Sequence, residues 1–181
     1  QAVPGGALSR PTAAGDAFAR YWMHNGLVTV DGQKMSKSLH NFVLAEDLLR
    51  ERDPLVVRYA LGAAHYRSSL DITDKTFAEA EAALDRIRTF LERVAREGDY
   101  GGTSFGNAAF DAAMDDDLGV PQALAVLHET VRRGNSALDE GDDAAAHRAA
   151  WETLAMTDVL GVNPHARHWR STDGSAAASA L

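Results

Sequence analysis

The sequence predicts a mainly α-helical protein in which a small α/β part is followed by an antiparallel helical bundle. Three observations predict this class. A short β-branched run at residues 27–30 ends at the turn pair Asp31-Gly32, which is typical of a strand entering a hairpin. After Asn41 the apolar residues recur at helical spacing almost to residue 160. Aromatic residues make up only 7% of the chain and alanine supplies much of its apolar content, which favours closely packed helices.

The α/β part is expected to span residues 17–70, after a lead-in over residues 1–16 that is rich in Gly, Pro, Ala and Thr and is predicted to be flexible. It opens with an aromatic run that includes Tyr21-Trp22 and ends at Asn25-Gly26. The strand at residues 27–30 follows, and a second strand is expected to start near Lys34. The far side of this hairpin is then the run Lys34-Met35-Ser36-Lys37-Ser38.

Two short helices and a link are expected next. The first helix has Val43, Leu44, Leu48 and Leu49 on one face. Pro54 either ends that helix or opens the next one, whose apolar stretch covers residues 55–61. Residues 65–71 are expected to form an extended link into the bundle.

The bundle is expected to span residues 71–163. Thr73 is a good N-cap for a long helix that is predicted to end near Gly98, before a Gly-rich connection. Its apolar residues form a seam at spacings of three and four. The seam consists of Phe77, Ala80, Leu84, Ile87, Leu91 and Val94.

Three more helices complete the predicted bundle. A short one begins near Asn107, a second has Pro121 in its first turn, and the last runs from about residue 143 to residue 160 and stops at Gly161. The last carries Trp151 and Leu154 as its expected apolar residues. Residues 164–181 show no periodicity and are predicted to be a disordered tail.

Composition limits the function classes. The sequence has no cysteine, which excludes disulfides and thiolate zinc sites, and it has no stretch that resembles a signal peptide or a membrane span. We therefore expect a cytoplasmic protein. The net charge is −8, but residues 20–67 carry seven Lys/Arg against five Asp/Glu. Any contact with nucleic acid is therefore expected to be local and to involve this basic end.

The run at residues 34–38 is the strongest candidate site. Two lysines three residues apart, with hydroxyls between and beside them and no acidic neighbour, suit a cationic loop that lays ammonium groups against a polyphosphate. The alternative is an ordinary solvated turn. Elsewhere, Asp115-Asp116-Asp117 suits the end of one helix and the cap of the next better than a metal site, because adjacent helical side chains diverge. Trp22 is expected in the core rather than on a ligand, and His24 beside it is a packed or solvent-facing histidine.

The strings YWMHNG and VDGQKMSKSLHNF resemble the cysteinyl-tRNA synthetase form of the KMSKS motif of class I aminoacyl-tRNA synthetases. The likeness runs from about Ala14 to Trp169 and includes Met114 to Leu124, which resembles the start of the family's helical bundle. It implies a cysteine–tRNA ligase that uses ATP with Mg²⁺, and a DALR-like bundle over residues 71–163 that binds tRNA(Cys). It also implies a monomer.

The resemblance assigns roles to individual residues. Lys37 matches the lysine that neutralises the phosphates during adenylation, and Lys34 steadies the same loop. The ATP-binding residues would be Lys34, Met35, Ser36, Lys37 and Ser38. Arg58 and Arg67 are candidate tRNA contacts, and for Arg67 a solvated arginine at a helix end is an equal alternative to a phosphate contact.

Three departures limit this reading. The His-x-Gly-His motif of the family is absent from these 181 residues, its zinc has no ligands here, and His40 stands where the family usually has glycine. We therefore expect a partial chain of the family that is inactive alone. Two alternatives stay open: a non-catalytic helical module that binds tRNA or a partner, and a related ligase that joins cysteine to an amino sugar.

Overall fold

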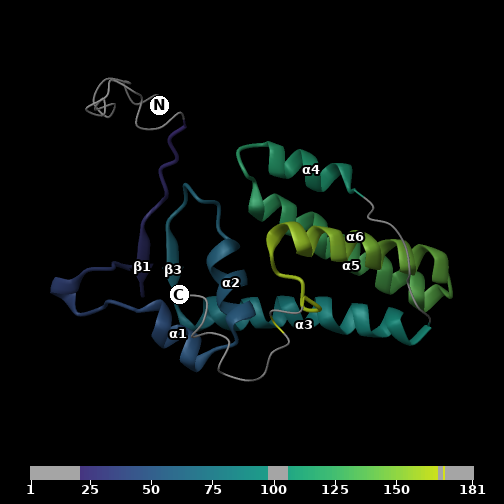
Figure 1. The fold of residues 1–181 in the computed structure, drawn as a ribbon, viewed down its shortest axis with the longest axis horizontal. Coiled ribbons are helices and arrows are strands. Elements are labelled where there is room, and N and C mark those ends of the chain that lie inside the picture. Colours follow the sequence, from purple (N-terminus) through teal and green to yellow (C-terminus); the bar gives the residue numbers. More distant parts are fainter. Residues whose placement is uncertain (1–20, 98–105, 167–168, 170–181) are drawn as a thin grey trace, which may run out of the picture.

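The computed structural model describes residues 21–97, 106–166 and 169, and within them it contains a three-stranded sheet and six α-helices. Figure 1 shows the sheet and α1 at one end of the molecule, α2 beside them, and the long helices α3, α5 and α6 at the other end. The predicted class, mainly α with a small α/β part, is confirmed. The expected lead-in over residues 1–16, the expected helix end at Gly98 and most of the predicted tail lie outside the described residues.

The hairpin forms where the sequence predicts it. Strand β1 (Val28–Val30) pairs antiparallel with β2 (Gln33–Lys34), so that Thr29 faces Lys34 and Val30 faces Gln33. Between them, Asp31 and Gly32 have φ angles of 49° and 73°. Both values lie in the left-handed region that a two-residue hairpin turn requires and that Asp-Gly pairs supply.

A third strand corrects the expected extended link at residues 65–71. Strand β3 (Leu70–Ile72) pairs parallel with β1, with Val28 opposite Leu70 and Val30 opposite Ile72. The strand order is β2-β1-β3, so β1 is the central strand. Three residues are too few for an alternating pattern to stand out in a sequence. The strand exists because the crossover through α1 and α2 returns the chain to the side of β1.

The two crossover helices differ in burial. Helix α1 (Ala45–Glu51) contains no fully buried residue: Leu48 of the predicted apolar face packs against the core, whereas Leu44 and Leu49 are exposed. Pro54 opens α2 (Pro54–Gly62), where the side chain of Asp53 accepts a hydrogen bond from the Leu55 amide at 2.8 Å. Helix α2 buries five residues against the bundle, namely Leu55, Val56, Val57, Tyr59 and Ala60.

The bundle is built around the predicted seam. The Thr73 hydroxyl caps α3 (Asp74–Glu97) by accepting from the Thr76 amide, and all six seam residues are buried. Burying one such large apolar side chain contributes roughly 1.5–3 kcal/mol. Helices α4 (Ala108–Asp115), α5 (Val120–Glu140) and α6 (Asp143–Leu160) follow, and the bounds of α6 are those the sequence predicts.

Helix α6 faces the core mainly with alanine and threonine, together with Met156, rather than with the expected Trp151 and Leu154. Ala146, Ala149, Ala150, Thr153 and Met156 are buried, whereas Trp151 and Leu154 are only half-buried. Alanines let α6 approach α5 closely. Gly134 of α5 belongs to the same contact, because a β-carbon there would lie 2.8 Å from that of Ala149 in α6, as well as 2.3 Å from the Phe90 ring of α3.

Two residues after the end of α6 also pack against the bundle. Val162 is buried and Trp169 packs against the core. No helix in the described part combines the length and apolar character needed to cross a membrane.

Candidate functional site

The Lys34–Ser38 run forms a closed loop at the end of the hairpin. Lys34 lies in β2, and Lys37–Leu39 forms one short 3₁₀ turn, η1. The side chain of Asn41 closes the loop from both sides: its Oδ1 accepts from the Ser36 amide at 2.9 Å, and its Nδ2 donates to the Lys34 carbonyl at 3.2 Å. The sequence analysis did not single out Asn41, although Asn is a residue that commonly satisfies turn backbone groups.

The two serines support the turn from inside. The Ser36 hydroxyl lies 3.1 Å from the Ser38 hydroxyl and accepts a hydrogen bond from the Leu39 amide at 3.3 Å. These hydroxyls organise the backbone of the loop, which explains their place between the lysines. Among the described residues no carboxylate pairs with Lys34, whose side chain is exposed. The loop thus offers an ammonium group that is not neutralised within the described part of the chain.

His40, which stands where the resemblance places a glycine, has a positive φ. Its φ of 52° lies in the left-handed region, where glycine is favoured and histidine is tolerated at some cost. The turn from η1 into Asn41 therefore uses a residue under mild backbone strain.

Asp71 of β3 holds the hairpin turn in place through two hydrogen bonds. Its Oδ1 accepts from the Thr29 hydroxyl at 2.6 Å and from the Gly32 amide at 2.9 Å. The hydrogen bond from Thr29, followed by that from Gly32, holds the pKa of the Asp71 carboxyl below its ordinary value. The carboxylate thus ties β1 and the hairpin turn to β3.

Arg67, a candidate tRNA contact, is bound within the protein. Its Nε donates to Asp117 Oδ2 at 2.7 Å, and its Nη2 donates to Asp117 Oδ1 at 3.2 Å. Asp115 ends α4 as expected, but Asp117 does not cap α5, because the N-cap position belongs to Gly119. The described residues contain no group of three or more side chains suited to a metal ion.

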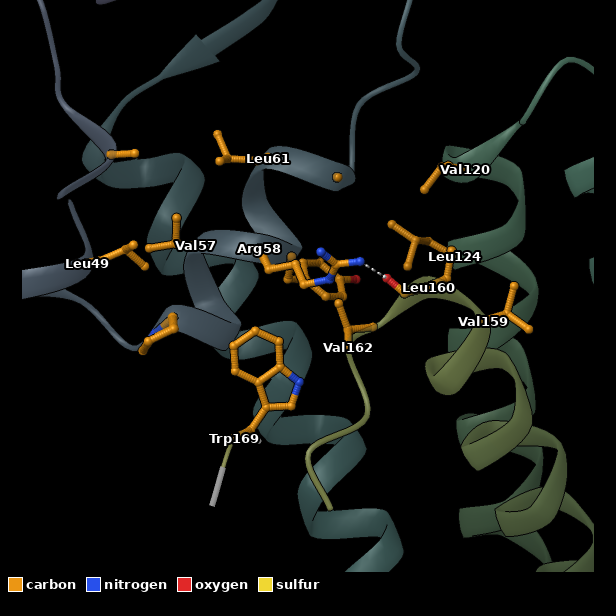
Figure 2. A pocket seen from close by; sticks show the side chains of 14 residues that line it. Leu49, Val57, Arg58, Leu61, Val120, Leu124, Val159, Leu160, Val162 and Trp169 are labelled. Atoms are coloured by element: carbon orange, nitrogen blue, oxygen red, sulfur yellow. Dashed lines mark hydrogen bonds between the residues drawn. The ribbon is translucent and has the colours of Figure 1, made fainter. Parts of the chain in front are cut away.

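Arg58, the other candidate tRNA contact, also has a partner within the protein. Its Nη2 donates to the carbonyl of Leu160 at 3.3 Å, next to Gly161, whose φ of 67° ends α6. Figure 2 shows this guanidinium among the apolar side chains of a cavity of about 720 Å³, with the Trp169 ring nearby. None of residues 34–38 lines that cavity. Arg58 thus completes the end of a helix, and its contact with tRNA stays a prediction.

Trp22 and His24 lie at the surface beside β1. The Trp22 side chain is 49% exposed, so the expectation of a core tryptophan is wrong. Its ring stacks on the His24 ring, with centroids 6.5 Å apart and planes 11° apart. A flat aromatic pair stands at the entry to the hairpin that carries the lysine loop.

Comparisons with known proteins agree with the motif reading. The family described as tRNA synthetases class I (C) catalytic domain matches residues 7–83, and the DALR domain matches residues 109–163. The chain is 58% identical to the cysteine–tRNA ligase of Leifsonia xyli subsp. xyli and 56% identical to that of Clavibacter michiganensis subsp. michiganensis. Each match covers 96% of this chain, and the chain spans about 38% of the length of each relative.

Proposed function

Because the chain belongs to the cysteine–tRNA ligase family of class I tRNA synthetases, we propose that it supplies the lysine loop and the tRNA-binding bundle of an ATP-dependent cysteine–tRNA ligase. The observation that carries this proposal is the loop at residues 34–38. Asn41 and the two serines hold its backbone while Lys34 stays exposed and unpaired with any described carboxylate. An organised loop with an exposed ammonium group is better explained by binding of a polyphosphate than by a purely structural role.

The proposed chemistry is adenylation of cysteine. An oxygen of the cysteine carboxylate forms a bond to the α-phosphorus of ATP, and the bond from that phosphorus to the bridging oxygen breaks, so that pyrophosphate leaves with the electron pair. Negative charge spreads over the phosphates in the transition state. Lys37 and Lys34 are the proposed groups that neutralise this charge, with Met35, Ser36 and Ser38 forming the rest of the ATP-binding loop.

The other parts of the family reaction follow as proposals. Mg²⁺ would accompany ATP, and the bundle over residues 71–163 would contact tRNA(Cys), with Arg58 and Arg67 of the unit at residues 17–70 as candidate contacts. A monomer in the cytoplasm is the expected state. No step is assigned to zinc, since the chain has no cysteine and its described part has no metal-suited cluster. The DALR match favours a tRNA ligase over an amino-sugar ligase.

The test uses a chimera in which this chain replaces the matching portion of the Leifsonia enzyme. Lys37→Ala should lower the rate of ATP–pyrophosphate exchange about 10²-fold and leave cysteine affinity nearly unchanged, because the lost contact acts in the transition state. Lys75→Ala is the matched control, since Lys75 is an exposed lysine of α3 paired only with Glu79 among the described ion pairs. An unchanged exchange rate in the Lys37→Ala chimera would refute the assignment.

A second assay addresses the 181-residue chain alone. The chain has no His-x-Gly-His motif, so nothing recognisable in it holds the adenine and ribose of ATP opposite the lysine loop. Proximity catalysis is then lost. We expect no cysteinylation of tRNA above background, with weak and salt-sensitive tRNA binding in a filter assay. Charging by the chain alone would contradict this expectation.

A further inference from the structure

The turn between α4 and α5 has an unusual backbone. Asp117 and Leu118 have φ angles of 53° and 55°, so two consecutive residues other than glycine lie in the left-handed region. Such residues cost free energy and persist only where surrounding contacts determine them. Leu118 is 44% exposed, so core packing does not account for the turn. The contacts of Asp117 do.

Asp117 collects donors from three consecutive residues. Tyr66 donates its hydroxyl hydrogen to Asp117 Oδ1 at 2.6 Å, Arg67 binds both carboxylate oxygens, and His65 Nε2 lies 3.0 Å from the Asp117 carbonyl. The hydrogen bond from Arg67, followed by that from Tyr66, holds the pKa of the Asp117 carboxyl below its ordinary value. The Arg67 guanidinium also lies over the Tyr66 ring, 5.0 Å from its centroid. Through Asp117 the bundle is hydrogen-bonded to residues 65–67, which we call the clasp segment.

The clasp segment also supports the hairpin. The Gly26 amide donates to the Tyr66 carbonyl at 2.7 Å, and the Leu70 amide donates to the Leu27 carbonyl at 2.9 Å. Gly26 approaches so closely that a β-carbon there would lie 2.0 Å from the Ser68 carbonyl oxygen. The residues that lead into β1 therefore contact the backbone of residues 66–68, within and just after the segment whose side chains bind Asp117.

We propose that Asp117 is a positioning residue that fixes the orientation of the lysine loop relative to the helical bundle. Asp117 lies about 50 residues from the clasp segment in sequence, so its contacts join the two halves of the chain. All the side chains involved are accessible to solvent, and exposed ion pairs contribute little net stability. Their use is therefore geometric: a hydrogen-bonded path leads from the α4–α5 turn through the clasp segment to β1 and the loop.

The catalytic consequence rests on the proposed function. If the loop acts on the phosphates of ATP, the orientation that Asp117 gives it decides whether the lysines reach them during adenylation. Asp117 itself then touches no substrate, and its removal should affect the rate of the chemical step rather than substrate binding.

The first test measures amide hydrogen exchange on the 181-residue chain. Asp117→Ala should raise the exchange rate of the Gly26 amide and of the β1–β2 hairpin amides about tenfold, while amides in the middle of α3 keep their protection. Asp116→Ala is the matched control, because it removes a neighbouring aspartate whose side chain makes no hydrogen bond to the clasp segment in the described structure, and it should leave the hairpin unchanged. Asp117→Asn keeps one acceptor oxygen and should give an intermediate rate. Unchanged hairpin exchange in Asp117→Ala would overturn the proposal.

The second test measures pyrophosphate exchange in the Leifsonia chimera. Asp117→Ala should lower kcat about tenfold with KM for cysteine unchanged, and adding Arg67→Ala should cause little further loss, because both changes break one contact. A lowered rate in Lys37→Ala with a normal rate in Asp117→Ala would overturn the positioning role. A normal rate in Lys37→Ala together with faster hairpin exchange in Asp117→Ala would instead refute the proposed function and leave the structural coupling supported.

Discussion

The hairpin region and the helical bundle are held together by different forces. None of the described side chains between residues 21 and 54 is buried, and most of the large exposed apolar side chains of the described chain belong to this stretch. The bundle, by contrast, buries Leu84, Ile87, Phe90, Leu91 and Val94 completely. The hairpin depends on hydrogen bonds and close backbone contacts, and the bundle depends on apolar burial.

The difference teaches where stability and function are separated in this chain. Apolar burial is the dominant source of folding free energy, so the bundle is expected to set the global stability. Segments with few buried contacts open more easily and are suited to loops that move during a reaction. The lysine loop lies in such a segment, and Asp71, Asn41 and Asp117 direct it without burying it.

The largest expected difference between the two regions is in the stability lost when a leucine is shortened to alanine. Leu84→Ala should lower the free energy of unfolding by roughly 2–5 kcal/mol, because Leu84 is completely buried in the α3 seam. Leu49→Ala, in the exposed helix α1, should change it by less than about 0.5 kcal/mol. Urea denaturation followed by circular dichroism measures both values. Shifts of similar size would mean that the hairpin region is packed as tightly as the bundle.

Two glycines provide the next comparison. Gly134→Ala introduces a β-carbon 2.3 Å from the Phe90 ring and should cost the bundle about 1–3 kcal/mol of unfolding free energy. Gly26→Ala meets the backbone of Ser68 and should instead increase hydrogen exchange in the hairpin, with a smaller change in the urea midpoint. Circular dichroism and hydrogen exchange together separate the two effects.

Gly62→Ala is the control for both glycine variants. No atom lies within 4 Å of the added carbon, and Gly62 is the last residue of α2. We expect a neutral effect or a gain of about 0.4–1 kcal/mol from the lower entropy of the unfolded chain. If Gly26→Ala resembled Gly62→Ala in hairpin exchange, the close contact of Gly26 with the backbone of Arg67 and Ser68 would not exist in solution.

Sequence reasoning succeeded where the pattern is long or the turn chemistry is specific. The seam of α3 extends over several turns, and all six residues that its periodicity predicted are buried, although it did not include the buried Ala83 and Phe90 of the same helix. Asp31-Gly32 and Gly161 were predicted to stand in turns or helix ends, and their positive φ angles agree. The string at residues 34–38 identified the loop, and the matches to known families agree with that identification.

The parts that sequence reasoning missed depend on distant contacts. Strand β3 has three residues and is defined by its neighbour β1, about 40 positions earlier in the chain. The Asp117 contacts cross about 50 positions and were hidden within a run of three aspartates. Helix α1 has an apolar face by periodicity, yet in the described chain Leu48 packs against the core while Leu44 and Leu49 stay exposed. Local pattern cannot report which surfaces meet.

The smallest expected effect is a difference in pH dependence between the two regions. His128 of α5 lies 2.8 Å from the Tyr59 hydroxyl of α2, with Arg86 of α3 and Arg132 of α5 nearby. Burial, with help from these two arginines, lowers the pKa of His128 below its ordinary value, whereas burial raises the pKa of Tyr59 to about 12. Next to the hairpin, Asp71 of β3 accepts hydrogen bonds from Thr29 and Gly32, and the pKa of its carboxyl is also lowered.

The direction in which pH changes the stability of each region depends on how the unfolded chain binds protons. Unfolded His128 binds a proton below about pH 6.5 while folded His128 resists it, so its stabilisation of the α2–α5 contact declines as the pH falls through that value. Asp71 favours the folded hairpin above about pH 3.9 and loses this effect only in more acidic solution. Between pH 7 and pH 5 we therefore expect the urea midpoint to fall while hairpin exchange, corrected for intrinsic rates, stays constant. His128→Gln should remove part of that fall, as measured from the difference between the two midpoint curves. Identical curves for the two proteins would show that His128 is solvated in the folded state.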